Sequence, residues 1–141
     1  MSASHLEFLL ALDRAHTTLA RRVDTRLGAL HGIGLKDLHL LVTLDRAPER
    51  RLRRIDLAQA LGVTPSGVTW MLRPLTKRRL VASADSATDA RVTYAVLTDG
   101  GRALMADAVP SARELAADLV GAHGARAELT AALALLERLA G

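Results

Sequence analysis

Basic side chains are concentrated in the middle of this chain, in a pattern that suits the binding of a polyanion. Between Arg46 and Arg91 there are nine arginines and one lysine against four carboxylates, a balance of +6, whereas the rest of the chain carries −2. Such side chains neutralise the phosphates of nucleic acid. The alternative is a solvated arginine-rich surface. The candidate phosphate contacts, which position a protein on a duplex without reading its sequence, are Arg51, Arg53, Arg54, Lys77 and Arg78.

The residues between these cations predict two short helices joined by a tight turn. The first covers about residues 55–61 and stops at Gly62, and the second covers about residues 65–79. Thr64 suits the N-cap of the second helix, and Pro65 suits its first position because no donor is needed there. This layout is typical of a helix-turn-helix, whose second helix enters the major groove of DNA. The chain is therefore expected to bind duplex DNA.

A β-hairpin is predicted directly after the second of these helices. Residues 81–83 and 92–97 have the pattern of two strands, with a polar tip over 85–89. Residues 51–53 suit a short edge strand. Thr98 is a suitable N-cap for a helix that reaches about residue 120 and bends at Pro110. A hairpin in this position would act as a wing beside the helix-turn-helix.

Long apolar helices are predicted on both sides of this segment. Helices are expected over about 4–30, 36–46 and 125–140; Leu38, Leu41, Val42 and Leu44 would point inward from the second. The first has an apolar stripe of Phe8, Leu12, Ala15, Leu19, Val23, Leu27 and Leu30, and the last has one of Leu129, Leu133, Leu136 and Leu139. Such stripes exceed what one small domain needs, so a homodimer is expected. The alternative is that they are satisfied within one subunit.

The composition excludes several classes of function. With 50% hydrophobic but only 2% aromatic residues, a leucine- and alanine-rich helical core is expected, and the absence of cysteine excludes disulfides, thiol redox sensing and cysteine-ligated zinc. No phosphate loop, nucleophile elbow or His-Glu-x-x-His motif indicates an enzyme. No metal site is expected from the spacing of His5, His16, His31, His39 and His123, and no cofactor is expected. Without a signal segment or membrane-spanning run, the expected location is cytoplasmic, with no membrane partner.

Taken together, these motifs resemble the MarR family of winged helix-turn-helix transcriptional regulators over nearly the whole chain. The most specific match is Asp89-x-Arg91 followed by Leu97-Thr98-x-Gly100. Leu57-Ala58, Leu61-Gly62-Val63, Val68-Thr69 and Leu75 also follow the family pattern. The resemblance implies a mainly α fold with a small β wing, in one domain over 1–141. Residues 35–98 would form the DNA-binding lobe, and residues 1–34 and 99–141 the dimerisation helices.

The resemblance also assigns contacts to the DNA. The first half of the second helix of the helix-turn-helix would face base edges, through Pro65, Ser66, Gly67, Thr69, Trp70 and Arg73. Arg91 would enter the minor groove from the wing, supported by Asp89. As the only tryptophan, Trp70 has an alternative role in covering the core between helix and wing.

A small-molecule effector, such as an organic anion or aromatic acid, is a further implication of the resemblance. Candidate pocket residues are Arg14, His16, Arg21 and His39, although each also suits a solvated or interfacial position. The predicted function is thus that of a sequence-specific, dimeric regulator of the repressor type, modulated by a ligand. The alternatives are a sequence-tolerant architectural DNA binder without an effector, and a winged helix used only for protein contacts.

Three positions depart from the family pattern. Arg79 stands where relatives usually have glycine, so it must either avoid positive φ or tolerate it. Pro74 lies inside the predicted recognition helix, where it removes one backbone bond. Trp70 stands where relatives often have arginine. Base contacts therefore cannot be copied from relatives.

Overall fold

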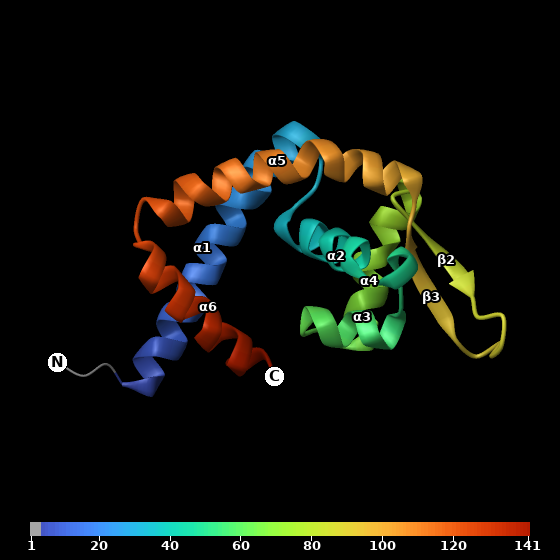
Figure 1. Cartoon of the computed structure of the whole chain (residues 1–141), viewed down its shortest axis with the longest axis horizontal. Coiled ribbons are helices and arrows are strands. Elements are labelled where there is room, and N and C mark those ends of the chain that lie inside the picture. Colours follow the sequence, from blue (N-terminus) through green and yellow to red (C-terminus); the bar gives the residue numbers. More distant parts are fainter. Residues whose placement is uncertain (1–3) are drawn as a thin grey trace.

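Two groups of helices, joined by one long helix, make up the computed structural model, which describes residues 4–141 (Figure 1). One group holds α1 and α6, and the other holds α2, α3, α4 and a small sheet, while α5 arches over both. The mainly α fold with a small β wing is confirmed. The elements are α1 (His5–His31), α2 (Leu35–Arg46), the 3-10 helix η1 (Pro48–Arg50), β1 (Arg51–Arg53), α3 (Arg54–Leu61), α4 (Pro65–Lys77), β2 (Val81–Asp85), β3 (Thr93–Leu97), α5 (Asp99–Gly121) and α6 (Arg126–Ala140).

The sheet has three antiparallel strands in the order β1-β3-β2. The predicted edge strand at 51–53 is confirmed, with Leu52 paired to Ala95. The hairpin is longer than predicted, because β2 continues to Asp85, which pairs with Thr93. The polar tip therefore covers residues 86–92 and not 85–89.

The main core lies between α2, α3, α4 and the sheet. Leu40, Leu41 and Leu44 of α2 are fully buried there, whereas Leu38 and Val42 are only partly buried. The prediction missed Leu40 because α2 is packed by α3 and α4 on one side and by α1 and α5 on another. The other buried members of this core are Leu57, Ala58, Val68, Leu72, Leu75, Leu80, Val81, Ala95, Leu97 and Met105.

A second, smaller core joins the two groups of helices. It consists of Leu27 of α1, Ile33 of the α1–α2 turn and Ala108 of α5. In the predicted apolar stripe of α1, Leu27 is thus buried and Phe8 is exposed. The partly buried members are Leu12, Leu19 and Val23. Most of α1 and all of α6 therefore lack a buried face within one protomer.

The predicted helix boundaries are set by local hydrogen bonds. Thr64 Oγ1 accepts from the N–H of Gly67 at 3.1 Å, and Thr98 Oγ1 accepts from the N–H of Gly101 at 3.0 Å. Gly62 ends α3 in the left-handed conformation, with φ +69°. Pro74 does not end α4, which continues to Lys77. Both N-caps predicted from the sequence are confirmed.

Arg79 adopts positive φ, at +60°, in the position where relatives usually have glycine. The turn after α4 is held by bonds from the Leu80 N–H to the Leu75 carbonyl at 2.9 Å and from the Arg79 N–H to the Thr76 carbonyl at 3.0 Å. Thr98 Oγ1 donates to the Arg79 carbonyl at 2.6 Å. These bonds hold an arginine in a conformation that disfavours side chains with a Cβ atom.

Replacing Arg79 with glycine should therefore stabilise the protein. We expect Arg79→Gly to raise the free energy of unfolding by about 0.5–1 kcal/mol, because relief of the left-handed strain exceeds the added entropy of the unfolded chain. Urea denaturation followed by circular dichroism measures this change. As a matched control, Gly62→Ala introduces the same strain in open space and should destabilise by about 1 kcal/mol. Destabilisation by both variants would contradict this account of Arg79.

Candidate nucleic-acid interface

One face of α4 packs on the core and the opposite face is exposed. Val68, Leu72 and Leu75 are buried, at spacings of three and four residues. The same periodicity leaves Ser66, Thr69, Trp70 and Arg73 together on the exposed face, with Pro65 at the helix start. Gly67 is partly buried, and a Cβ atom there would lie 3.2 Å from Thr64 Oγ1. Five of the six predicted base contacts are thus exposed, and Gly67 allows the tight N-cap.

The Trp70 indole lies on the surface beside Arg73. Trp70 is 69% exposed, so the alternative that it covers the core between helix and wing is wrong. The Arg73 guanidinium lies 4.8 Å from the centre of the Trp70 ring, a cation–π contact. This contact restricts the orientation of Arg73 before any ligand is bound.

The wing presents a single extended cation near its tip. The Arg91 side chain is 92% exposed. Asp89 Oδ1 accepts from the Arg91 backbone N–H at 3.0 Å and from its Nε at 3.4 Å. Because an exposed ion pair of this kind is weak, the backbone bond is the main contribution of Asp89. Asp89 therefore holds the turn that presents Arg91.

Three of the predicted phosphate contacts lie near other polar side chains. Arg53 pairs with Asp56 at 2.7 Å, and this hydrogen bond, together with the charge of Asp56, raises the pKa of the Arg53 guanidinium. Arg54 Nη2 donates to Ser83 Oγ at 3.2 Å. Arg51 lies 5.5 Å from the centre of the Tyr94 ring.

A groove between α4 and β2 brings together cations that are far apart in the sequence. Arg54, Arg73 and Lys77 line it, together with Trp70 and Ser83. Arg51 and Arg53 instead line a depression under the wing tip, with the polar side chains Ser86 and Thr88. Four of the five candidate phosphate contacts thus line two separate depressions.

Arg78, the fifth candidate phosphate contact, is bound within the protein. Its Nη1 donates to the Gly32 carbonyl at 2.6 Å, and its Nη2 donates to the His31 carbonyl at 3.4 Å. The guanidinium is therefore bound to the end of α1 although the residue is exposed, and its role as a phosphate contact stays a prediction. Sequence reasoning assigned Arg78 by its neighbours, whereas its partners lie 46 and 47 residues away.

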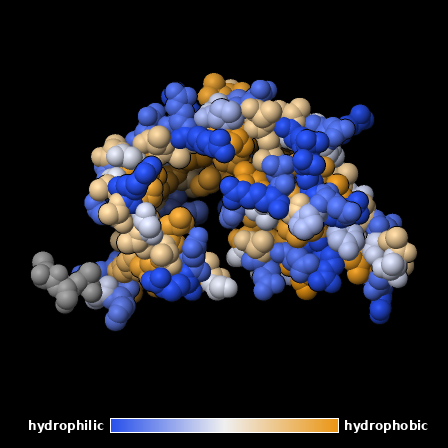
Figure 2. Space-filling view, viewed as in Figure 1, coloured by the Kyte–Doolittle hydropathy of each residue, from blue (hydrophilic) through white to orange (hydrophobic). Residues whose placement is uncertain are grey.

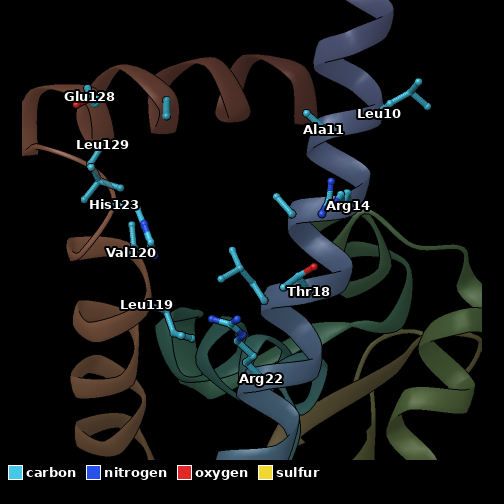
Figure 3. Close-up of a pocket in the computed structure, with 14 residues that line it drawn as sticks. Leu10, Ala11, Arg14, Thr18, Arg22, Leu119, Val120, His123, Glu128 and Leu129 are labelled. Carbon is cyan, nitrogen blue, oxygen red and sulfur yellow. The ribbon is translucent and has the colours of Figure 1, made fainter.

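The predicted effector pocket is only partly assembled. Arg14 lines a groove between α1 and the α5–α6 turn (Figure 3), whereas His16, Arg21 and His39 are exposed and do not line it, so their assignment to a ligand pocket stays a prediction. The groove instead contains Arg22 and His123, which were missed, beside apolar residues such as Leu119 and Leu129. The spacing of Arg14, Thr18 and Arg22 could have indicated this shared helix face.

Within the range 4–141, no group of three or more His, Asp or Glu side chains lies in a position to hold a metal ion. None of the helices described has both the length and the apolar character needed to span a bilayer.

Comparison with known proteins gives matches to transcriptional regulators. The regulator AdcR of Streptococcus pyogenes serotype M6 is 30% identical over 92 residues, which are 62% of this chain and 63% of AdcR. The structure of Sco3205, a MarR family regulator from Streptomyces coelicolor, was solved in complex with DNA. It superposes with a TM-score of 0.86 at 25% identity, over 99% of this chain and 89% of that one. The fold is that of the MarR family.

A further structural match is to a protein whose DNA binding is regulated by a small organic acid. BpsR of Bordetella bronchiseptica, described with regulation of its DNA binding by 6-hydroxynicotinic acid, superposes with a TM-score of 0.81 at 22% identity, over 99% of this chain and 97% of that one. No family model matches the sequence. The resemblance to MarR regulators is confirmed by the structural matches, and the relatives named are regulators and not enzymes.

Proposed function

We propose that this chain is a sequence-specific, dimeric DNA-binding regulator of the MarR type, acting as a repressor whose operator binding responds to a small organic anion. The observation that carries the proposal is the exposed polar face of α4, with Arg54 and Lys77 in the groove beside it and Arg91 extended from the wing. The DNA complex of Sco3205, which has the same fold, supports it.

Each part of the interface has a distinct task in this proposal. Ser66, Thr69 and Arg73 contact base edges in the major groove, where a bidentate arginine–guanine pair discriminates by about 1–3 kcal/mol. Arg91 enters the minor groove, which is most favourable where A·T tracts narrow it. The phosphate contacts are Arg51, Arg53, Arg54 and Lys77, which lie around the two flanking grooves.

The exposed apolar surface of α1 and α6 supports a homodimer. Leu129, Leu133, Leu136 and Leu139 of α6 are 40–60% exposed, and Leu6, Leu9 and Leu10 of α1 are about as open. Hydrophobic (orange) patches are visible on this arm in Figure 2. Exposed apolar surface of this extent on two helices is typical of a protein interface. A second copy that covers it would present two recognition helices to two half-sites.

The groove in Figure 3 has the chemistry of a site for a lipophilic anion. Arg14, Arg22 and His123 supply donors, and Leu10, Leu119, Val120 and Leu129 supply apolar contacts. An acid held there by the guanidinium groups would touch α1, α5 and α6 together. Its binding would shift the population of dimer shapes, and a coupling of about 1–3 kcal/mol to DNA binding is typical.

The runner-up is an architectural DNA binder that tolerates any sequence and has no effector. Few side chains on α4 could read bases, whereas several cations suit phosphates, and both observations favour this alternative. It requires that Trp70 and Arg73 contact DNA without distinguishing one base from another. The two candidates differ in one quantity, the ratio of specific to non-specific affinity.

This ratio is measured by fluorescence anisotropy with DNA from upstream of the chain's own gene and with a scrambled duplex, at several salt concentrations. We expect the native fragment to bind at least about 1,000-fold more tightly than the scrambled duplex, the lower end for specific regulators. Emission from Trp70, the only tryptophan, should change on binding because α4 enters the groove. Equal, steeply salt-dependent binding to both duplexes would favour the architectural binder.

Removal of the wing cation should have a distinct signature. We expect Arg91→Ala to weaken binding to many sequences and to reduce the slope of log K against log salt by about one, as for the loss of one backbone-type contact. Arg138→Ala, on α6 and far from the wing, is the charge-matched control and should leave the slope unchanged. An unaltered slope for Arg91→Ala would count against its role.

The dimer is tested by placing charges in the apolar face of α6. We expect Leu133→Glu/Leu136→Glu to weaken self-association by at least about 100-fold, because buried carboxylates would lack partners. Analytical ultracentrifugation measures this. Ala131→Glu, on the opposite side of the same helix, is the control and should remain dimeric. A wild-type chain that sediments as a monomer at micromolar concentration would refute the dimer.

A further inference from the structure

The turn between α1 and α2 is a junction at which several elements meet. α1 ends at His31, and Gly32 follows in the left-handed conformation with φ +69°. His31 Nε2 is hydrogen-bonded to Ser111 Oγ of α5 at 2.8 Å. Asp24 Oδ1 accepts from the Leu35 N–H at 2.7 Å. These bonds fix the turn to α1, α2 and α5, which belong to the helical framework around the DNA-binding lobe.

Arg78 connects α4, the proposed recognition helix, to the α1–α2 turn. It is the C-cap residue of α4, and its guanidinium donates to two successive carbonyls, those of Gly32 and His31. Carbonyls at a helix C-terminus lack intrahelical donors and form the negative end of the helix dipole. The planar fork of arginine suits such a pair better than the single ammonium of lysine. Within residues 4–141, these are the hydrogen bonds that join the end of α1 directly to α4.

The local backbone holds Arg78 in position for this contact. Arg79 reverses the chain with positive φ, and its carbonyl is bound by Thr98 at the start of α5. At the other end, a Cβ atom on Gly32 would lie 3.3 Å from Arg78 Nη2, so glycine leaves room for the guanidinium. Each side of the contact thus has a left-handed residue directly after a helix, Gly32 after α1 and Arg79 after the α4 cap.

We propose that Arg78 is a positioning residue that sets the angle between the recognition helix and the dimer arm, and thereby the half-site spacing that the dimer accepts. The spacing part rests on the proposed function, because it requires a dimer that binds DNA. The angle part does not, because Arg78, α1 and α4 belong to one protomer. In a dimer built on α1, α5 and α6, a small rotation of α4 about its end changes the separation of the two recognition helices.

The angle is measured by double electron–electron resonance in the full chain. The chain has no cysteine, so Thr17→Cys on α1 and Ala60→Cys on α3, both exposed, accept spin labels specifically. Dilution with unlabelled protein restricts the measurement to one protomer. We expect a single narrow distance distribution, which becomes at least about twofold broader or shifts with Arg78→Gln, and an intermediate result with Arg78→Lys.

The spacing is measured with duplexes that carry two half-sites separated by different numbers of base pairs. We expect Arg78→Gln to reduce the preference for one spacing from at least about tenfold to less than about threefold, while affinity for an isolated half-site is unchanged. Arg102→Gln, an exposed cation on α5, is the control for charge and should match wild type in both assays.

The outcomes separate the two proposals. A distance distribution for Arg78→Gln that matches wild type would overturn the positioning role, whatever the DNA binding. If Arg78→Gln does not fold, Arg78→Lys carries the test, and wild-type width and spacing in that variant would overturn the proposal. A wild-type chain that binds no duplex but whose distribution broadens with Arg78→Gln would refute the proposed function while supporting the angle.

Discussion

The position of the wing and of α4 depends on one close approach between two backbones. The Leu80 carbonyl lies where a side chain on Gly101 would have to be, so any Cβ atom there would displace the end of α4 from the first turn of α5. The Thr98 N–H donates to this same Leu80 carbonyl at 3.1 Å. The turn after the recognition helix and the start of the long connecting helix are thus locked together. Because α5 packs on α1 and leads to α6, the orientation of α4 and the sheet relative to α1 and α6 depends on this contact.

The distribution of arginine roles follows from this arrangement. Arginines near the lobe are divided between those bound to protein groups, such as Arg53 and Arg78, and those that extend into solvent, such as Arg91. A count of charges in the segment 46–91 overestimates the number of phosphates that could be neutralised, because a guanidinium held by a carboxylate or by backbone carbonyls brings less free charge to DNA. Under the proposed function, the salt dependence of DNA binding is therefore expected to report fewer phosphate contacts than this segment contains cations.

Features fixed by local chemistry could be predicted from the sequence, and features fixed by distant contacts could not. Thr64, Thr98 and Gly62 act within four residues of themselves, so their roles follow from the residue type and its place. Leu40 escaped the prediction because its burial requires elements on two sides of α2. The groove around Arg14 joins α1 to residues a hundred positions later, such as Leu119 and His123, and no local pattern indicates that pairing. The contact of Arg78 with the end of α1 could not be predicted for the same reason.

The same physical link bears on how a ligand could act at a distance from the DNA. The groove of Arg14, Arg22 and His123 lies at one end of α5, and the Leu80–Gly101 contact lies at the other. Leu27, Ile33 and Ala108 pack between these ends, where α1 crosses α5. Under the proposed function, a change in the angle between α1 and α5 at the groove would act on this small core and on the α1–α2 turn to which Arg78 is bound. Since coupling between two sites is reciprocal, DNA that holds α4 at one angle would in turn select one width of the groove.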